Sequence, residues 1–301
     1  MKKVLEKLVG SANVLVNEPM KNHTSLRVGG NADFLITPQT KKCLCDAVSS
    51  LRAQNIPATV IGNGTNILVG DLGIRGVVVK ISQGMGGVEI DGTKITAQSG
   101  VLLSRLANMA CSSGLCGLEF AAGIPGSVGG AVVMNAGAYD HEIKEVVAET
   151  MYIDRAGKLG ILKGIRQHQF GYRTSVFQAE NWVIIESVFK LKRGDSAEIR
   201  AKMDSIIRKR KRQQPLELPN AGSAFKRPKS GFAAKLIEDA GLKGYAIGGA
   251  MVSEKHGGFI VNTGNATARD VRRLMSKIQN DVLEKFDVKL EPEIKFVGIF
   301  E

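Results

Sequence analysis

The sequence has few of the residues that would indicate a disulfide-bonded or metal-based protein. Its 301 residues include only four cysteines and four histidines. Cys43, Cys45, Cys111 and Cys116 are too sparse for a disulfide scaffold, and they lack the paired C-x2-C spacing of a zinc site. The histidines form neither H-x-x-x-H nor H-E-x-x-H. We therefore expect reduced thiols, with Cys43, Cys45 and Cys111 on helices as small apolar residues, and no metal.

Long hydrophobic runs are also missing. No stretch approaches the roughly 18 apolar residues that a membrane span needs. Glu6 and Lys7 interrupt the apolar run at the N-terminus before a secretory signal could form. These absences predict a cytoplasmic protein. With 44% hydrophobic and 23% charged residues, the composition is that of an ordinary globular protein and argues against disorder of the bulk chain.

Acidic residues are in deficit. The 41 Lys and Arg outnumber the 29 Asp and Glu, and the net charge of +12 predicts an anionic partner. Eight basic residues and one acid lie between residues 208 and 229. This run is typical of a solvated helix end, of a nucleic-acid-binding surface or of a site for a small diphosphate ligand. Nucleic-acid binding would need aromatic platforms, and only Phe225 lies within the run, so the small ligand is favoured.

The hydrophobic periodicity predicts a mixed α+β protein. We expect strands at 31–37, 58–61, 67–69, 77–81 and 291–300, and helices at 41–54, 101–113, 197–212, 232–240 and 268–286. In the last strand, Ile294, Phe296 and Phe300 should share one face. We place the domain boundaries so that the parts are residues 1–84, 85–196 and 197–301.

Two glycine-rich segments suggest ligand binding, although neither is a known nucleotide motif. Gly62 and Gly64 follow a strand, but Ile67 stands at the third glycine of G-x-G-x-x-G and no acid lies near residue 82. No Gly-Lys-Ser/Thr of a P-loop is present in either segment. Residues 62–66 (GNGTN) form either an anion-binding nest or a simple tight turn. Residues 114–138, with seven glycines and five alanines, allow either backbone approach to a flat ligand such as a flavin or close strand packing.

Nine short segments, in this order along the chain, resemble those of the UDP-N-acetylenolpyruvoylglucosamine reductase family. These flavoenzymes complete UDP-N-acetylmuramic acid for bacterial peptidoglycan. The segments are residues 22–30 (NHTSLRVGG), 61–69 (IGNGTNILV), 117–119 (GLE), 123–131 (GIPGSVGGA), 135–139 (NAGAY), 171–175 (GYRTS), 220–226 (NAGSAFK), 256–262 (HGGFIVN) and 291–293 (EPE). Each segment alone is weak evidence for the family, but nine of them in the same order are together specific for it.

The resemblance implies a vanillyl-alcohol-oxidase-type (PCMH-type) FAD-binding fold. Two lobes, residues 1–84 and 85–196, would clasp a non-covalent FAD, and a C-terminal α+β domain at 197–301 would bind substrate. Backbone amides would carry most of the FAD recognition. The positions that match the family's FAD-binding segments are Gly62, Asn63, Gly64, Thr65, Asn66, Ile124, Pro125, Gly126, Ser127, Gly129, Gly130, Val133 and Gly137.

The resemblance also implies a reaction in two halves. NADPH reduces FAD, and UDP-N-acetylglucosamine-enolpyruvate then takes up a hydride and a proton. The family motifs assign Arg173 to the stabilisation of an enol-like intermediate and Glu293 to its support by hydrogen bonding. They assign Ser223 as the proton donor. Three further candidates for gripping the substrate or the nicotinamide nucleotide are Tyr139, Arg227 and Lys235.

The chain departs from the family pattern in places. Thr65 stands where Ser is frequent, which preserves the hydroxyl. Gln213 stands where a Lys often precedes Gln-Pro, and Arg210 or Arg212 would have to supply that charge. Only about 50 residues separate Arg173 from Ser223, as in the shorter class that lacks a tyrosine-bearing substrate lid.

Two other functions remain open at this point. One is a different FAD-dependent alcohol oxidoreductase of the same fold, and the other is a basic nucleic-acid-binding protein. For a member of the reductase family we expect small-molecule partners, namely NADPH and the enolpyruvyl nucleotide. We expect no nucleic acid, no membrane and no obligate protein partner.

Overall fold

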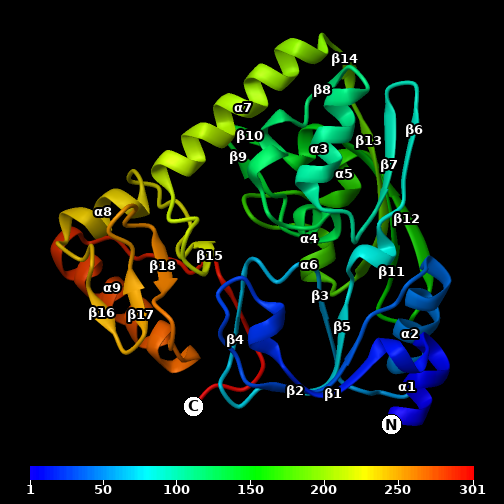
Figure 1. Cartoon of the computed structure of the whole chain (residues 1–301), viewed down its shortest axis with the longest axis horizontal. Helices are drawn as coiled ribbons and strands as arrows, with labels where there is room; N and C mark the ends of the chain where they lie inside the picture. The colour runs from blue at the N-terminus through cyan, green and yellow to red at the C-terminus, as the bar shows by residue number, and fades with distance from the viewer. The chain divides into compact units, whose positions relative to one another are not determined.

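The computed structural model describes all 301 residues, which form two compact units (Figure 1). Unit 1 comprises Met1–Val16, Phe34–Asn63 and Gly76–Lys209, and unit 2 comprises Asn17–Asp33, Gly64–Arg75 and Arg210–Glu301. Helices and strands mix in both units, which confirms the predicted α+β class. None of the helices combines the length and the apolar character needed to span a bilayer. The division into residues 1–84, 85–196 and 197–301 stays a prediction.

Unit 1 is built on an antiparallel five-stranded sheet. Its strands, in spatial order, are β12 (Leu159–Lys163), β11 (Val147–Ile153), β13 (Val183–Lys190), β7 (Lys94–Gln98) and β6 (Val88–Asp91). The short helix α4 (Val128–Val133) contacts β7 and β13, and α3 (Leu103–Ser112) buries Leu103 and Leu106 in the same core. The glycine-rich segment 114–138 therefore folds mainly as turns and α4, packed against a sheet.

A second sheet has the order β1 (Val14–Pro19), β2 (Asn31–Ile36), β5 (Ile74–Lys80) and β3 (Ala58–Ile61). In unit 1, β3 and β5 pair in parallel, from Ala58 opposite Val77 to Ile61 opposite Lys80. The helices α1 (Lys2–Val9) and α2 (Lys41–Ala53) pack together, and the apolar face of α2 shares a core with both sheets of the unit. The parallel pairing brings the residues after β3 and after β5 to the same edge of the sheet.

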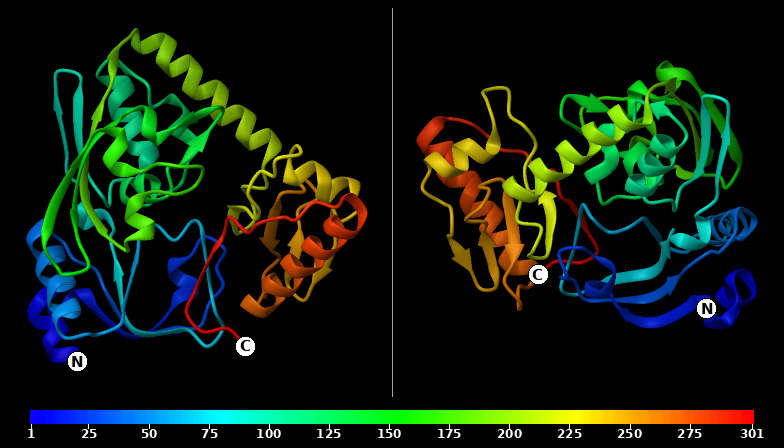
Figure 2. Two further views of the ribbon diagram at one scale, coloured as in Figure 1. Left: turned by 180° about the vertical axis from the view of Figure 1, so that it is seen from behind. Right: turned by 45° about the horizontal axis from the view of Figure 1, so that its top comes forward.

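Unit 2 places two helices beside an antiparallel sheet (Figure 2). The sheet order is β15 (Asn220–Ser223), β18 (Phe259–Asn262), β17 (Ala250–Val252) and β16 (Ala246–Ile247). Helix α9 (Ala268–Phe286) contacts β16, β17 and α8 (Ala233–Asp239). A capping box of Thr267 and Asp270 begins α9, as its Thr-x-x-Asp sequence predicts.

The remaining α-helices and strands are short, apart from α7. They are α5 (Gly164–His168), α6 (Val176–Ala179), α7 (Ser196–Gln213), β4 (Ile67–Val69), β8 (Leu115–Cys116), β9 (Gly137–Ala138), β10 (His141–Glu142), β14 (Lys192–Arg193) and β19 (Lys295–Val297). Helix α7 agrees with the prediction for 197–212. As expected, Cys43 and Cys45 lie on α2 and Cys111 on α3, and all four thiols are free.

The predicted strand at 291–300 is wrong in its length and in its facing. Only β19 forms, paired in parallel with β4, and Phe296 is 45% exposed whereas Ile294 is 2% exposed. The segment before β19 bonds elsewhere, because the N–H of Glu293 donates to the carbonyl of Ala224. Gly298, at φ +80°, then ends the extended run. Alternation along this segment therefore does not separate a buried face from an exposed one.

Candidate active site

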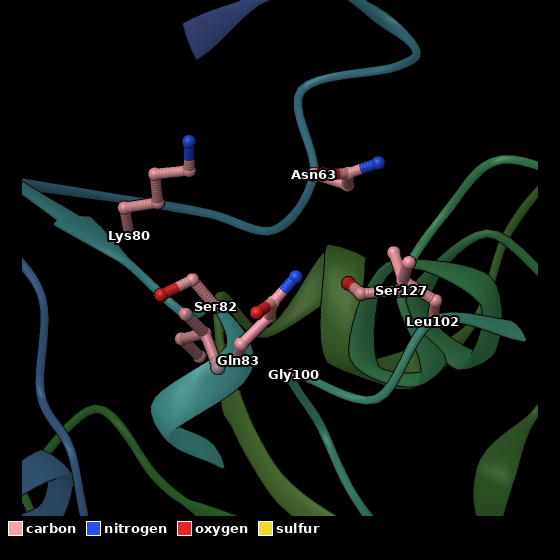
Figure 3. A pocket seen from close by; sticks show the side chains of 8 residues that line it. Asn63, Lys80, Ser82, Gln83, Gly100, Leu102 and Ser127 are labelled. Carbon is pink, nitrogen blue, oxygen red and sulfur yellow. The ribbon is translucent and has the colours of Figure 1, made fainter. Parts of the chain in front are cut away.

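A pocket of about 290 Å³ lies in unit 1, at the edge where β3 and β5 end (Figure 3). The sequence predicts two of its residues, Asn63 and Ser127, as FAD ligands. Six others were missed, and they are Lys80, Ile81, Ser82, Gln83, Gly100 and Leu102. Lys80 to Gln83 reach the pocket because β3 and β5 pair in parallel, and residues that follow parallel strands meet at one edge of the sheet. The sequence alone does not indicate this pairing.

The pocket wall contains a buried polar group that lacks a partner. Ser127 is 3% exposed, and its hydroxyl makes no hydrogen bond. Figure 3 shows this hydroxyl and the Gln83 amide turned toward the space between them. The absence of a side chain at Gly62 leaves room for the Ser127 hydroxyl, because a Cβ at residue 62 would collide with the Ser127 Oγ. Buried hydroxyls are normally satisfied, so a polar ligand suits this wall.

The GNGTN turn is built from several backbone contacts. In unit 1, the Asn63 side chain donates to the carbonyl of Pro125 at 2.7 Å, which joins two segments assigned to FAD. In unit 2, Gly64 has φ +67° and its carbonyl accepts from Ser25 N at 3.0 Å. The Asn66 side chain donates to the Glu293 carbonyl at 3.2 Å. Glycine at residue 64 suits the left-handed conformation. The donors and open backbone of unit 1 fit a flavin cofactor at Gly62, Asn63 and Ser127.

Arg173 lies against the segment assigned to FAD. Its Nη2 donates to the carbonyl of Gly137 at 3.2 Å, and Ser175 Oγ donates to the carbonyl of Val133 at 2.7 Å. Arg173 itself has a left-handed φ of +57° in a turn closed by a bridge between Gly171 and Thr174. Left-handed non-glycine residues are uncommon and are enriched at functional sites.

Unit 2 brings Ser223 beside the segment that carries Glu293. Ser223 ends β15, and the carbonyl of the next residue, Ala224, accepts from Glu293 N at 2.9 Å. Both side chains are half-buried. Arg173 belongs to unit 1, and so its alignment with Ser223 and Glu293 stays a prediction.

Two lysines next to Glu293 were not predicted. Lys226 Nζ donates to Glu291 at 3.1 Å. Burial lowers the pKa of Lys295, the Lys226 charge lowers it further, and the Glu293 carboxylate opposes both effects. Glu293 thus lies beside a lysine, Lys295, whose charged form the surrounding burial disfavours.

The three substrate-binding candidates differ in their surroundings. The Tyr139 hydroxyl donates to the carbonyl of Ile206 at 3.4 Å, and Lys209 Nζ lies 5.7 Å from its ring centroid. The Arg227 guanidinium lies 4.1 Å from the Phe232 ring centroid. Lys235 is exposed and donates to Asp239 at 2.5 Å, and this bond raises the pKa of Lys235. Tyr139 belongs to unit 1 and the other two to unit 2.

Comparison with known proteins agrees with these features. Residues 32–162 match the FAD binding domain, and residues 214–297 match the UDP-N-acetylenolpyruvoylglucosamine reductase, C-terminal domain. The reductase of Caldanaerobacter subterraneus subsp. tengcongensis is 50% identical over 294 residues, which cover 98% of this chain and 97% of that protein. That of Clostridium botulinum strain Hall is 50% identical over 293 residues, covering 97% and 95%.

A solved structure is similar over nearly the whole chain. The UDP-N-acetylenolpyruvylglucosamine reductase of Thermus caldophilus is 34% identical with a TM-score of 0.80, covering 94% of this chain and 98% of that one. The fold and the site thus define an FAD-binding oxidoreductase with a C-terminal α+β domain. The chain belongs to the UDP-N-acetylenolpyruvoylglucosamine reductase family. This membership confirms the resemblance and the fold class predicted from it.

Proposed function

We propose that this chain reduces the enolpyruvyl ether of UDP-N-acetylglucosamine-enolpyruvate to UDP-N-acetylmuramate, with NADPH as reductant and FAD as non-covalent cofactor. The reaction belongs to peptidoglycan precursor synthesis, and we place it in the cytoplasm. The observation that supports the proposal best is the bond from Glu293 to Ala224 beside Ser223, in a chain of this family. The partners are then two small molecules, both anionic, which suits a net charge of +12.

The residues of the pocket would hold the cofactor. Asn63 and Ser127 in the pocket wall, and Gly62 next to Ser127, would approach the cofactor, with Lys80 and Gln83 across the pocket (Figure 3). When bound, FAD supplies the hydride that reduces the carbon–carbon double bond. The family motifs add residues 124–137, where α4 and its flanking turns expose backbone groups.

Three side chains would stabilise the negative charge that develops on the substrate and supply its proton. Arg173 would bind the substrate carboxylate and stabilise negative charge that develops next to it, because a guanidinium stays charged and can bind a carboxylate through two donors. Glu293 would support the enolic form by a hydrogen bond. Ser223 would donate the proton to the carbon that bears the ether oxygen and the carboxylate. A serine hydroxyl is a poor acid in water, so this step requires water to be excluded.

The remaining candidates would grip the rest of the ligands. Arg227, stacked on Phe232 at the exposed surface of unit 2, suits a diphosphate. Tyr139 and Lys235 are proposed for the substrate or the nicotinamide nucleotide. Lys235 would have to give up its bond to Asp239, an exposed pair whose loss costs little.

An absorbance spectrum of the purified chain tests the proposal. We expect flavin bands at about 450 nm, loss of these bands on addition of NADPH, and their return on anaerobic addition of the enolpyruvyl nucleotide. An alcohol oxidoreductase of the same fold would instead be reduced by an alcohol and reoxidised by oxygen. A colourless protein that cannot be reconstituted with FAD would contradict both enzyme functions and favour nucleic-acid binding.

A further inference from the structure

Arg173 has an acidic neighbour, Glu142, that the family motifs do not assign. Its Nη1 lies 4.0 Å from Glu142 Oε1, while its Nη2 donates to the Gly137 carbonyl. The side chains of Arg173 and Glu142 are each 18% exposed. In such partly buried surroundings a carboxylate attracts a guanidinium more strongly than it does in water. Glu142 is therefore close enough to attract the Arg173 guanidinium.

Glu142 is itself held by two neighbouring side chains, of which Asn135 is buried. Asn135 Nδ2 donates to Glu142 Oε2 at 3.1 Å, and Lys144 Nζ approaches the same oxygen at 2.5 Å. The other oxygen, Oε1, is the one nearest to Arg173. Glu142 N donates in turn to Glu145 Oε1 at 2.9 Å. The carboxylate thus has one oxygen bound by its own segment and one directed to the arginine.

Asn135 connects this segment to the turn that carries Arg173. The Asn135 side chain is fully buried, and Nδ2 also donates to the Gly171 carbonyl at 3.0 Å. Its Oδ1 accepts from Lys144 N at 3.0 Å. Both polar atoms of its side chain therefore link residues 142–144 to the turn at residues 171–174. Its backbone has a left-handed φ of +43°, a conformation that costs energy and persists only where the surroundings require it.

The hairpin of β9 and β10 brings Glu142 into close contact with Gly137. Strands β9 and β10 pair Glu142 with Gly137, and a Cβ at Gly137 would lie 2.8 Å from the Glu142 Cγ. Only glycine allows the Glu142 side chain to pack across the same residue whose carbonyl binds Arg173.

We infer that Glu142 is a positioning residue for Arg173, and that Asn135 holds Glu142 in place. The inference rests on the proposed function, because it assumes that Arg173 binds the substrate carboxylate. A guanidinium already held in its working orientation does not have to be ordered when the substrate arrives. Misplacement of a catalytic group by about 1 Å can cost about 100-fold in rate.

The test uses the FAD-loaded full chain with Glu142→Gln, which keeps the side-chain shape and removes the charge. We expect reoxidation of the reduced flavin by UDP-N-acetylglucosamine-enolpyruvate to slow by about 10- to 100-fold. Reduction by NADPH should stay within about twofold of wild type. Binding of UDP-N-acetylmuramate to the oxidised enzyme, followed by the flavin spectrum, should weaken as well. The control is Glu149→Gln, which removes an exposed pair with Lys163 at 3.9 Å in the same unit and should change none of these.

A double-mutant cycle with Arg173→Ala separates positioning from structural support. If Glu142 acts through Arg173, Glu142→Gln should slow reoxidation no further in the Arg173→Ala background. Glu142→Asp keeps the charge and should recover part of the rate, and it serves if Glu142→Gln does not fold. The same slowing with and without Arg173, or equal slowing of both half-reactions, would overturn the inference. A wild-type protein that the enolpyruvyl nucleotide does not reoxidise would contradict the proposed function instead.

Discussion

The backbone N–H of Glu293 donates a hydrogen bond to the carbonyl of Ala224 across 2.9 Å. A neighbouring bridge between Phe225 and Pro292 continues the contact. The two segments lie far apart in the sequence, and each carries one residue that the family motifs assign to catalysis. Their joining within unit 2 means that Ser223 and Glu293 are placed by the same local packing. Substitutions at the two residues should therefore affect the same half of the reaction.

Ser223→Ala should separate the two half-reactions. Removing the hydroxyl takes away the proposed proton donor, so reoxidation by the enolpyruvyl nucleotide should fall by about 10²- to 10⁴-fold. Reduction of the flavin by NADPH needs no proton from this residue and should survive. Rapid-mixing absorbance measurements of each half give the answer. Ser230→Ala, at an exposed serine of the same unit, is the control. Equal loss in both halves would assign Ser223 to structure.

Glu293 should tolerate Gln better than Ala. If its role is to hold the enolic form by a hydrogen bond, the amide introduced by Glu293→Gln retains a donor, whereas Glu293→Ala retains none. We expect reoxidation to be slower in the Ala variant by about tenfold or more relative to Gln, since one well-placed hydrogen bond contributes about 1.5 kcal/mol. Both variants should be reduced by NADPH at wild-type rates. Similar rates in the two variants would show that the hydrogen bond is unimportant.

The two buried hydroxyls without partners provide a matched pair for FAD binding. Ser99 and Ser127 are 1% and 3% exposed, and only Ser127 lines the pocket. In the FAD-free protein, each change to Ala removes an unsatisfied polar group and should leave the thermal midpoint unchanged or raised. Only Ser127→Ala should also weaken FAD, by about 2- to 10-fold in Kd, measured by flavin fluorescence. Equal FAD affinity in the two variants would contradict the assignment of Ser127.

The sequence predicted elements well where the signal is local. The helix at 268–286 and the strand at 58–61 agree with α9 and β3 at both ends, because periodicity, capping and glycine turns act within a few residues. The strand at 291–300 was wrong because its course depends on β4 and Ala224, which are remote in sequence. Lys80 and Gln83 were missed for the same reason, since only the pairing of β3 with β5 brings them to the pocket.

The candidate site shows the same limit more strongly. A serine in a turn, an arginine in a loop and an acid near the C-terminus carry no local signal, so Ser223, Arg173 and Glu293 came only from family motifs. Their proposed roles stay predictions. Asn135 had no signal beyond its place in the segment 135–139, and Glu142 lies outside all nine segments, because their importance lies in contacts with the turn at residues 171–174.

Asp71 should stabilise helix α9 from outside the helix. Its two carboxylate oxygens accept from the N–H groups of Ala268 and Arg269 at 2.8 and 2.9 Å. These are first-turn donors that the helix itself cannot satisfy. Asp71→Ala should lower the free energy of unfolding by about 0.5–2 kcal/mol, as loss of an N-cap does. Denaturant unfolding of the full chain measures the change. The comparison is Asp91→Ala, at an exposed residue of unit 1, which should have little effect.

His168 should make the protein less stable in mild acid. The side chain is fully buried, with Nδ1 2.7 Å from the Gly164 carbonyl and Nε2 2.9 Å from Thr150 Oγ1. A carbonyl can only accept, so Nδ1 carries the proton and Nε2 of the neutral ring accepts from Thr150. Burial lowers the pKa of His168 from its ordinary value of 6.5, although the bond to Gly164 opposes the shift.

The sign of the effect follows from proton uptake. Below about pH 6.5 the unfolded chain binds a proton that the folded chain does not, so stability falls as the pH decreases toward the lowered folded-state pKa. His168→Asn should reduce the stability at neutral pH and also flatten the loss of thermal midpoint between about pH 7.5 and about pH 5.5. Burial lowers the pKa of His256 in unit 2 as well, so His256→Asn should flatten the profile in the same direction. Because the two residues lie in different units, the double variant should flatten it further. An unchanged acid slope in His168→Asn would show that this histidine is protonated equally in the folded and unfolded states.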